Sequence, residues 1–408
     1  MPVKSFKVAM VAACPFPANW GTPGAIREMS ETLADMGHEI HIVTYPYGED
    51  LSVGRAKLWR PWYWRNGAQL HSGPSYQKLL FDFLMIFELC RVVRRERIDI
   101  IHAHNYEGVI IGMIAKLFTR RPLLYNAVNL MSDELPSSGF IRPRFLARAI
   151  AGVLDWFVPK FPDHFIAITE DLRRAMIKHG VPDSRISFVP CGVKPEMFDR
   201  ADPTALRERY GVGERPVIMY TGITSPFQRI DYLLKAFATV LKQEPSALLT
   251  VVSPLEHDPN YPAHKEVADS LGVSPSVIWV EGHTLEELPD YLAMATVTVI
   301  PRPEIPGHPI KLLNYMAARK PTVCFAGAAK GVKHMQEVLI VPDHDCEALG
   351  QGIVTLLRDP ALARRLGANA RATLVASFDW RTLCHDVETA YEAMTGGAGS
   401  SAVLENVA

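Results

Sequence analysis

The chain has 408 residues, of which 48% are hydrophobic and 21% charged, a balance typical of a soluble globular protein with room for two domains. Its formal net charge of −1 gives no basic excess, which argues against nucleic acid as a main partner. The six cysteines are scattered without a CxxC pair, so we expect reduced thiols in a cytoplasmic protein and no zinc site. We expect neither a signal peptide nor a membrane-spanning helix, because no stretch offers about twenty consecutive apolar residues.

The first half of the chain alternates between strand and helix patterns. Lys7–Ala13 is a continuous apolar run, typical of a parallel strand buried on both faces. After the loop CPFPANWGTPG we expect a helix near Ala25–Met36, closed by Gly37 at its C-cap. Further strands are predicted at His38–Thr44, Arg97–Ala103, Pro122–Ala127, Asp163–Ile168 and Ile186–Val189, with helices at Val109–Phe118 and Thr169–Gly180. This alternation predicts a doubly wound parallel sheet.

The second half repeats the alternation after a polar, weakly periodic stretch at residues 193–215, which we interpret as an interdomain connection. Strands are predicted at Pro216–Thr221, Ala247–Val252, Val277–Val280, Val297–Ile300, Thr322–Phe325 and Val338–Val341, and helices at Asp231–Leu241, Leu285–Ala293, Pro309–Arg319, Cys346–Arg358, Pro360–Phe378 and Trp380–Met394. We therefore expect Rossmann-like α/β domains at 1–192 and 216–378, a helix at 379–395 that crosses back to the first domain, and a disordered tail at 396–408. Ligands of open parallel sheets bind beyond the carboxyl ends of strands, which predicts a site in a cleft between the two domains.

The segment Ala295–Lys330 has the pattern of a phosphate site. A strand and a Pro- and Gly-rich loop lead into the helix predicted from Pro309, a residue suited to a first helical position. His308 is a poor N-cap, so the first N–H groups of the helix have no obvious side-chain partner. Lys311 adds a cation in the first turn, where the helix dipole disfavours it unless an anion is bound. The alternative is a solvent-exposed lysine on an ordinary connecting helix.

Four stretches in order resemble the retaining glycosyltransferases of family 4, which have the GT-B fold. They are KVAMVAA with GTPGAIREMSETLADMGHEIHIVT, IDIIHAHNYEG, VIMYTGITSPFQRIDYLLKAF, and PRPEIPGHPIKLLNYMAARKPTV. The resemblance implies two facing Rossmann-like domains and transfer of a sugar from a nucleotide-diphosphate donor, with retention and without a metal or another cofactor. The N-terminal domain would hold the acceptor and the C-terminal domain the donor.

The same resemblance implies roles for particular residues. His104 matches the family histidine that contacts the donor sugar, whereas His102 is more consistent with a structural role. The loop residues Gly21, Thr22 and Gly24 match the glycine loop, although Gly24 could equally be an ordinary turn glycine. The helix start at Gly307, His308 and Lys311 would hold the diphosphate.

The donor segment departs from the family pattern. The two family glutamates align with Pro306 and Asn314, so neither carboxylate is present, although Glu304 could replace the first one. Asn314 can still hydrogen-bond a ribose hydroxyl. Ile223 stands at the place of the family arginine, and we expect Arg229, Arg302 and Lys311 to share the diphosphate charge instead. A solvated surface cation is the alternative for each.

Two further motifs need separate interpretation. Arg55–Arg65, RAKLWRPWYWR, combines aromatic and basic side chains, and the amphiphilic run Lys78–Arg97 follows it. We expect contact with an anionic membrane surface there, the alternative being a loop packed internally. Asp343 and Asp345 have the D-x-D spacing of metal-dependent transferases, but their position predicts a surface loop.

These patterns predict a cytoplasmic glycosyltransferase, peripheral at the membrane, that extends a lipid-linked or polysaccharide acceptor. The missing glutamates motivate one alternative, a non-catalytic relative that acts as a binding or scaffold protein. A sugar-nucleotide epimerase is the other alternative. The nucleotide base, the sugar and the linkage cannot be chosen from the sequence.

Overall fold

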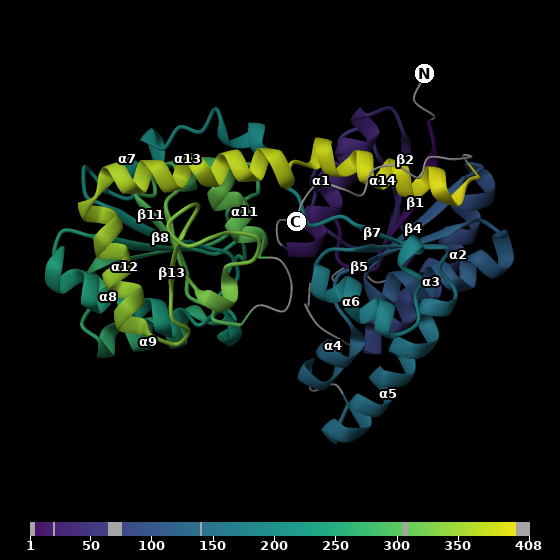
Figure 1. The fold of residues 1–408 in the computed structure, drawn as a ribbon, viewed down its shortest axis with the longest axis horizontal. Coiled ribbons are helices and arrows are strands. Elements are labelled where there is room, and N and C mark those ends of the chain that lie inside the picture. The colour runs from purple at the N-terminus through teal and green to yellow at the C-terminus, as the bar shows by residue number, and fades with distance from the viewer. Residues whose placement is uncertain (1–4, 19–20, 64–75, 139–140, 305–308, 397–408) are drawn as a thin grey trace. The chain divides into compact units, whose positions relative to one another are not determined.

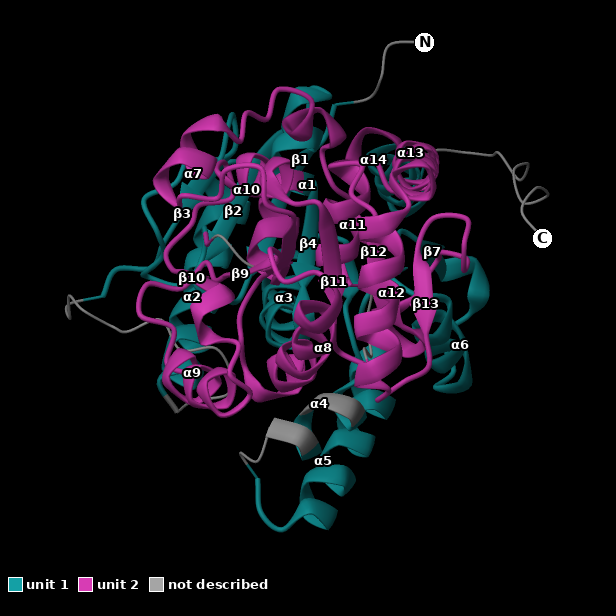
Figure 2. Cartoon of the chain, turned by 90° about the vertical axis from the view of Figure 1, so that its left-hand side faces the viewer, with its two compact units in different colours: residues 1–17, 29–190, 383–408 teal, residues 18–28, 191–382 magenta. Residues whose placement is uncertain are grey.

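The structure is a computed structural model that describes residues 5–18, 21–63, 76–138, 141–304 and 309–396. The chain forms two compact units, which Figure 2 distinguishes by colour. Unit 1 comprises residues 1–17, 29–190 and 383–408, and unit 2 comprises residues 18–28 and 191–382. Each unit is built around one parallel sheet (Figure 1), so the prediction of two Rossmann-like α/β halves is confirmed.

Unit 1 contains a seven-stranded sheet in the order β3-β2-β1-β4-β5-β6-β7. Its strands are β1 Lys7–Ala12, β2 Glu39–Thr44, β3 Lys57–Trp59, β4 Ile100–His104, β5 Leu123–Ala127, β6 His164–Ala167 and β7 Ile186–Phe188. All neighbouring strands are parallel. The central strands β4 and β5 are buried throughout, as the continuous apolar runs predict. The chain runs outward from β1 and returns to β4 on its other side, so a topological switch point lies between β1 and β4.

Helices pack on both faces of this sheet. They are α1 Gly21–Asp35, which unit 2 shares through residue 28, α2 Tyr76–Arg95, α3 Asn105–Thr119, α4 Met131–Ser138, α5 Arg144–Phe157, α6 Glu170–Lys178 and the C-terminal α14 Trp380–Met394. The helix α1 ends as predicted, with Gly37 at a φ of +103°. It begins four residues earlier than predicted, because Pro23 is compatible with the first turn of a helix.

Unit 2 contains a six-stranded parallel sheet in the order β10-β9-β8-β11-β12-β13. Its strands are β8 Val217–Thr221, β9 Leu248–Val252, β10 Val277–Val280, β11 Val297–Ile300, β12 Thr322–Phe325 and β13 Leu339–Val341. Its helices are α7 Thr204–Arg209, α8 Ile230–Gln243, α9 Tyr261–Ser270, α10 Leu288–Met294, α11 Ile310–Ala317, α12 Cys346–Arg358 and α13 Pro360–Ser377. Short 3-10 turns occur in both units. They are Val158–Lys160 and Asp183–Arg185 in unit 1, and Pro195–Phe198, Pro226–Gln228, Ser274–Ser276 and Ala326–Ala328 in unit 2.

The stretch at residues 193–215 contributes to the core of unit 2. Val193, Phe198 and Val212 are buried in one hydrophobic cluster of this unit, and Val193 forms a β-bridge with Asp379. The segment therefore packs as part of unit 2, although its polar sequence shows little periodicity.

The end of α14 belongs to the core of unit 1, as the predicted crossover helix requires. Tyr391 is fully buried, and its hydroxyl bonds His102 Nδ1 at 2.8 Å. Glu388 pairs with His38 Nε2 at 2.8 Å. Among the described residues, no helix is both long and apolar enough to cross a membrane.

Candidate functional site

Unit 2 carries a pocket at the carboxyl edge of its sheet. The pocket has a volume of about 270 Å³. Its walls come from the first turns of α1, the segments that follow β8, β9, β10 and β11, and the start of α11: Gly21, Gly24, Ala25, Glu28, Thr221, Gly222, Ile223, Gln228, Pro254, His283, Leu285, Leu288, Arg302, Pro309, Ile310, Lys311 and Asn314. The strands β8 and β11 form the switch point of this sheet, the position at which parallel sheets bind ligands.

Lys311 is held in this pocket by two side chains from elsewhere in unit 2. Its Nζ donates hydrogen bonds to Tyr220 Oη at 2.7 Å and to Gln228 Oε1 at 2.8 Å. The hydroxyl of Tyr220 in turn donates to the carbonyl oxygen of Ile223 at 2.7 Å. The ammonium group is therefore fixed against the loop that follows β8, and Lys311 is not a freely solvated lysine.

Two cations approach each other in the pocket. Burial of the ammonium group and the nearby charge of Arg302 lower the pKa of Lys311 to about 7. Burial also lowers the pKa of Arg302. Glu28 is the one carboxylate among the described residues that line the pocket, and it accepts a hydrogen bond from Trp380 Nε1 at 3.0 Å. An anion in the pocket would offset the repulsion between the two cations and favour the charged form of Lys311.

The amino end of α11 opens at the same place. Pro309 occupies the N-cap position, one residue before its predicted place in the first turn, and no side chain of the described residues caps the helix there. Tyr315 fixes the other side of this helix, since its hydroxyl accepts a hydrogen bond from the backbone N–H of Thr221 at 2.9 Å. Uncapped N–H groups at a helix start attract anions.

Only some of the other residues predicted for the donor site line the pocket. Arg302 and Asn314 line the pocket. Arg229 does not line it, because its guanidinium forms two hydrogen bonds with Asp231, at 2.9 and 2.8 Å, and lies over the Tyr232 ring. Glu304 is exposed and also lies outside the pocket wall. Gly307 and His308 lie outside the described residues.

His283 is a pocket residue that the sequence did not single out. Its side chain is buried, and its Nδ1 donates to the carbonyl oxygen of Thr284 at 2.9 Å. The neutral ring therefore presents Nε2 as an acceptor, and this atom is buried without a partner among the described residues. Burial lowers the pKa of His283, which favours the neutral ring. A ligand N–H or O–H group would satisfy this acceptor.

The glycines predicted in the first loop belong to the first turn of α1. Gly21 and Gly24 line the pocket, and a Cβ added to either would meet no atom within 4 Å. Gly24 lies in this helix and not in a turn, and its predicted role at the ligand stays a prediction. Gly21 has a φ of +46°, which disfavours most other residues. Thr22 does not line the pocket.

A second polar group lies at the carboxyl ends of β4 and β5 in unit 1. The amide nitrogen of Asn126 lies 3.2 Å from His104 Nδ1, so the amide donates and the neutral histidine carries its proton on Nε2. Burial lowers the pKa of His104 to about 3, so the ring is neutral at physiological pH. His104 Nε2 and Asn126 Oδ1 are both buried without a partner among the described residues. One unused donor and one unused acceptor thus stand side by side, a pattern suited to hydroxyl groups.

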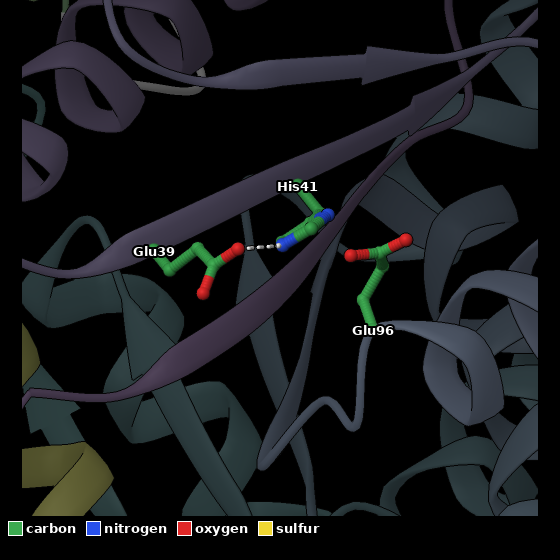
Figure 3. A group of neighbouring side chains, drawn as sticks. All are labelled: Glu39, His41 and Glu96. Atoms are coloured by element: carbon green, nitrogen blue, oxygen red, sulfur yellow. Dashed lines mark hydrogen bonds and ion pairs between the residues drawn. The ribbon is translucent and has the colours of Figure 1, made fainter.

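Three residues of unit 1 lie close enough together to suggest a metal site, namely Glu39, His41 and Glu96 (Figure 3). The indole N–H of Trp59 donates to His41 Nδ1 at 3.1 Å, which leaves the proton of the neutral ring on Nε2, facing Glu39 at 3.2 Å. A protonated nitrogen cannot bind a metal. Glu39 is also paired with Lys57 at 2.7 Å and Lys7 at 2.8 Å. This cluster is therefore best explained as an ion-pair network.

The D-x-D motif has structural partners, as its predicted surface position allows. Asp345 caps α12 by accepting from the N–H of Ala348 at 2.8 Å, and Asp343 accepts from the N–H of Gly327 at 2.9 Å.

Comparison with known families accounts for most of the chain. The model described as Glycosyltransferase Family 4 matches residues 23–197, and the model described as Glycosyl transferases group 1 matches residues 215–359.

Individual relatives and structures resemble the chain at low sequence identity. The GDP-mannose-dependent alpha-(1-6)-phosphatidylinositol monomannoside mannosyltransferase of Mycolicibacterium smegmatis is 29% identical over 49% of this chain, and the match spans about half, 54%, of that relative. The D-inositol 3-phosphate glycosyltransferase of Kribbella flavida is 24% identical over 90% of this chain and 89% of its own length. The structure of sucrose-phosphate synthase from Thermosynechococcus elongatus superposes with a TM-score of 0.78 at 18% identity, covering 96% of this chain and 100% of that one.

Proposed function

The chain belongs to glycosyltransferase family 4, and from this premise we propose that it transfers a sugar, with retention of configuration, from a nucleotide-diphosphate sugar to a lipid-linked or glycan acceptor. The observation that carries the proposal is the pocket of unit 2, where Lys311 and Arg302 line the same wall as the uncapped start of α11. The Mycolicibacterium relative is named for transfer from GDP-mannose to a phosphatidylinositol mannoside, which supports the same substrate classes.

The chemistry of the pocket suits a diphosphate leaving group. Negative charge builds on the diphosphate as its bond to the sugar breaks, and preorganised cations and N–H groups stabilise that charge. We infer that Lys311, Arg302 and the first N–H groups of α11 provide this stabilisation, so that no metal ion is required. Arg229 remains a predicted phosphate ligand, but the arrangement gives it no support, because its charge is already paired with Asp231.

Other groups have roles in orientation within this proposal. Asn314 and His283 would hydrogen-bond the nucleoside. Gly21 and Gly24 have no side chain, so the face of α1 that lines the pocket leaves room for the ligand. His104 would donate its Nε2–H to a hydroxyl of the transferred sugar, with Asn126 Oδ1 as a neighbouring acceptor. The missing family glutamates do not remove any of these groups.

The proposal is tested with the purified protein and a panel of GDP-, UDP- and dTDP-sugars, by measuring release of the nucleoside diphosphate with and without a lipid extract. We expect release that depends on the acceptor, with Lys311→Met lowering it at least 100-fold and Lys333→Met, an exposed lysine of the same unit, leaving it unchanged. Isomerisation of the nucleotide sugar would support an epimerase instead. Absence of any nucleotide binding by the folded protein would support a scaffold role.

A further inference from the structure

The helix α5 of unit 1 exposes an apolar face. Phe145, Val153 and Trp156 are 73%, 62% and 58% exposed, and Leu146, Ile150 and Phe157 add smaller exposed areas beside them. These residues recur at helical spacing along one side of α5, where the part of the chain that the structure describes does not cover them. Large exposed apolar patches on a folded protein mark interaction surfaces.

The orientation of α5 is fixed by its opposite face. Ala147, Ala151 and Asp155 are buried there, one turn apart. The carboxylate of Asp155 accepts from the backbone N–H groups of Met131 and Ser132 at 2.9 Å each, which caps the start of α4. Figures 1 and 2 show α4 and α5 side by side at the outer end of this unit. Because Asp155 is anchored inside, the apolar side chains must point away from the body of unit 1.

Charge distinguishes between the partners that could cover this face. Arg142, Arg144 and Arg148 are exposed at the start of α5, and Lys160 follows its end, with its ammonium group over the Trp156 ring. The single acidic residue of α5 is Asp155, which is buried. A second copy of the chain would bring like charges together on this face. An anionic surface would instead attract all four cations while the apolar side chains leave water.

We propose that α5 docks on an anionic phospholipid surface. Phe145, Val153 and Trp156 enter the boundary between head groups and acyl chains, and the neighbouring arginines contact the lipid phosphates. This surface differs from the Arg55–Arg65 segment predicted from the sequence. There, Trp59 donates to His41, and Arg60 donates to the carbonyl of Phe16. Among the described residues of that segment, Trp62 is the exposed tryptophan.

The docking surface is independent of the transfer reaction, because none of its residues lines the pocket of unit 2. The test is flotation of the full chain with vesicles of phosphatidylcholine alone or mixed with phosphatidylglycerol. We expect flotation with the mixed vesicles only, weakening as salt is added. The double variant Phe145→Ser/Trp156→Ser and the charge variant Arg144→Glu/Arg148→Glu should each need at least ten times more anionic lipid. Both change exposed positions, and thermal unfolding at the wild-type temperature verifies that they fold.

Two controls make the result specific. Phe188→Ser changes an exposed apolar residue of β7, 47% exposed, and Trp62→Ser changes the exposed tryptophan of the predicted segment, 79% exposed; both should float like the wild type. The proposal is overturned if the wild type stays in the soluble fraction with both vesicles, or if Trp62→Ser abolishes flotation while the α5 variants keep it. A dimer in sedimentation velocity that dissociates in the Phe145→Ser/Trp156→Ser variant, without flotation of the wild type, would assign the face to a second copy of the chain.

Discussion

Single residues at strand ends define the chemistry of unit 1. His104 ends β4, and Asn126 lies beside it on β5, at the position that pairs with His104 in the sheet. The amide fixes which nitrogen of the imidazole carries the proton, a property decided by the partner of the other ring nitrogen. The histidine could be chosen from its place at a strand end and from the family resemblance. The ring nitrogen that carries the proton could not be predicted from the sequence, because Asn126 lies in a different motif.

Replacing Asn126 by aspartate should reverse this proton position. A carboxylate accepts from Nδ1–H, so His104 Nε2 would become an acceptor and could no longer donate to a sugar hydroxyl. We expect turnover to fall about 10- to 100-fold, the size of the loss found when the partner that orients a metal-bound histidine is removed. Nitrogen-15 chemical shifts of His104 would report the change of tautomer directly. Asn369→Asp, the same change at an exposed position of unit 2, is the control, and equal turnover of the two variants would contradict the assigned role.

His104 should also make the protein sensitive to acid. Its pKa is about 3 in the folded chain and about 6.5 when unfolded, so the unfolded chain binds the proton first as the pH falls. The free energy of unfolding is therefore highest above pH ~6.5 and decreases toward pH ~3. By pH 5 the decrease amounts to about 2 kcal/mol. Urea unfolding at pH 7 and pH 5 measures this loss, which should be smaller by that amount in His104→Asn. The exposed His385→Asn serves as the reference, and identical pH dependence in all three proteins would refute the prediction.

At the scale of elements, the helix α11 combines an uncapped start with a lysine that is only partly protonated at neutral pH. Binding of a nucleoside diphosphate favours the charged form, so the complex should take up a proton. Above pH ~7 the affinity should therefore fall, by up to about tenfold for each pH unit, because the free protein has lost that proton. Lys311→Arg should remove most of this dependence, since arginine stays charged.

Calorimetry in buffers of different ionisation enthalpy measures the proton uptake of the wild type. Lys333→Arg should behave like the wild type in the same experiment. Affinity that is independent of pH in the wild type would show that Lys311 does not face the bound diphosphate.

Elements differ in how well the sequence predicts them. The strands β10, β11 and β12 match their predicted ranges, because all three are rich in β-branched and aromatic residues, and β11 and β12 are also buried throughout. The helices α5 and α9 were not predicted. The polar sequence of α9 shows little periodicity, whereas the apolar side chains of α5 do recur at helical spacing, so that this helix could have been found from the sequence. The side-chain contacts within the pocket were even harder to predict from the sequence. Tyr220 and Gln228 hold Lys311 across 91 and 83 residues of sequence, and only the packing of the sheet brings them together.

At the scale of the molecule, the last helix completes the first unit. Tyr391 bonds His102, and Glu388 bonds His38, so both histidines depend on residues near the end of the chain. The same segment buries Leu383, Val387 and Ala390. Unit 1 is therefore incomplete without a segment that follows unit 2 in sequence.

Removing residues 383–408 should accordingly destabilise unit 1 and spare unit 2. The truncation exposes buried apolar side chains and leaves His102 and His38 without their partners, each costing about 1–3 kcal/mol. We expect calorimetry to give an early transition that nucleoside diphosphate does not shift, followed by one that it does. A chain ending at residue 396 provides the control. Loss of nucleotide binding together with the early transition would contradict the division into two units.

The path of the backbone also governs how hybrids of this enzyme must be made. The chain passes from one unit to the other at 17/18, 28/29, 190/191 and 382/383. In a chimera fused only at 190/191, unit 2 would receive Gly21 and Gly24 from the protein that supplies unit 1. Unit 1 would receive its C-terminal helix from the protein that supplies unit 2. The pocket wall of unit 2 and the core of unit 1 would then each combine residues of two proteins. Exchange of specificity between relatives therefore requires these segments to be transplanted together.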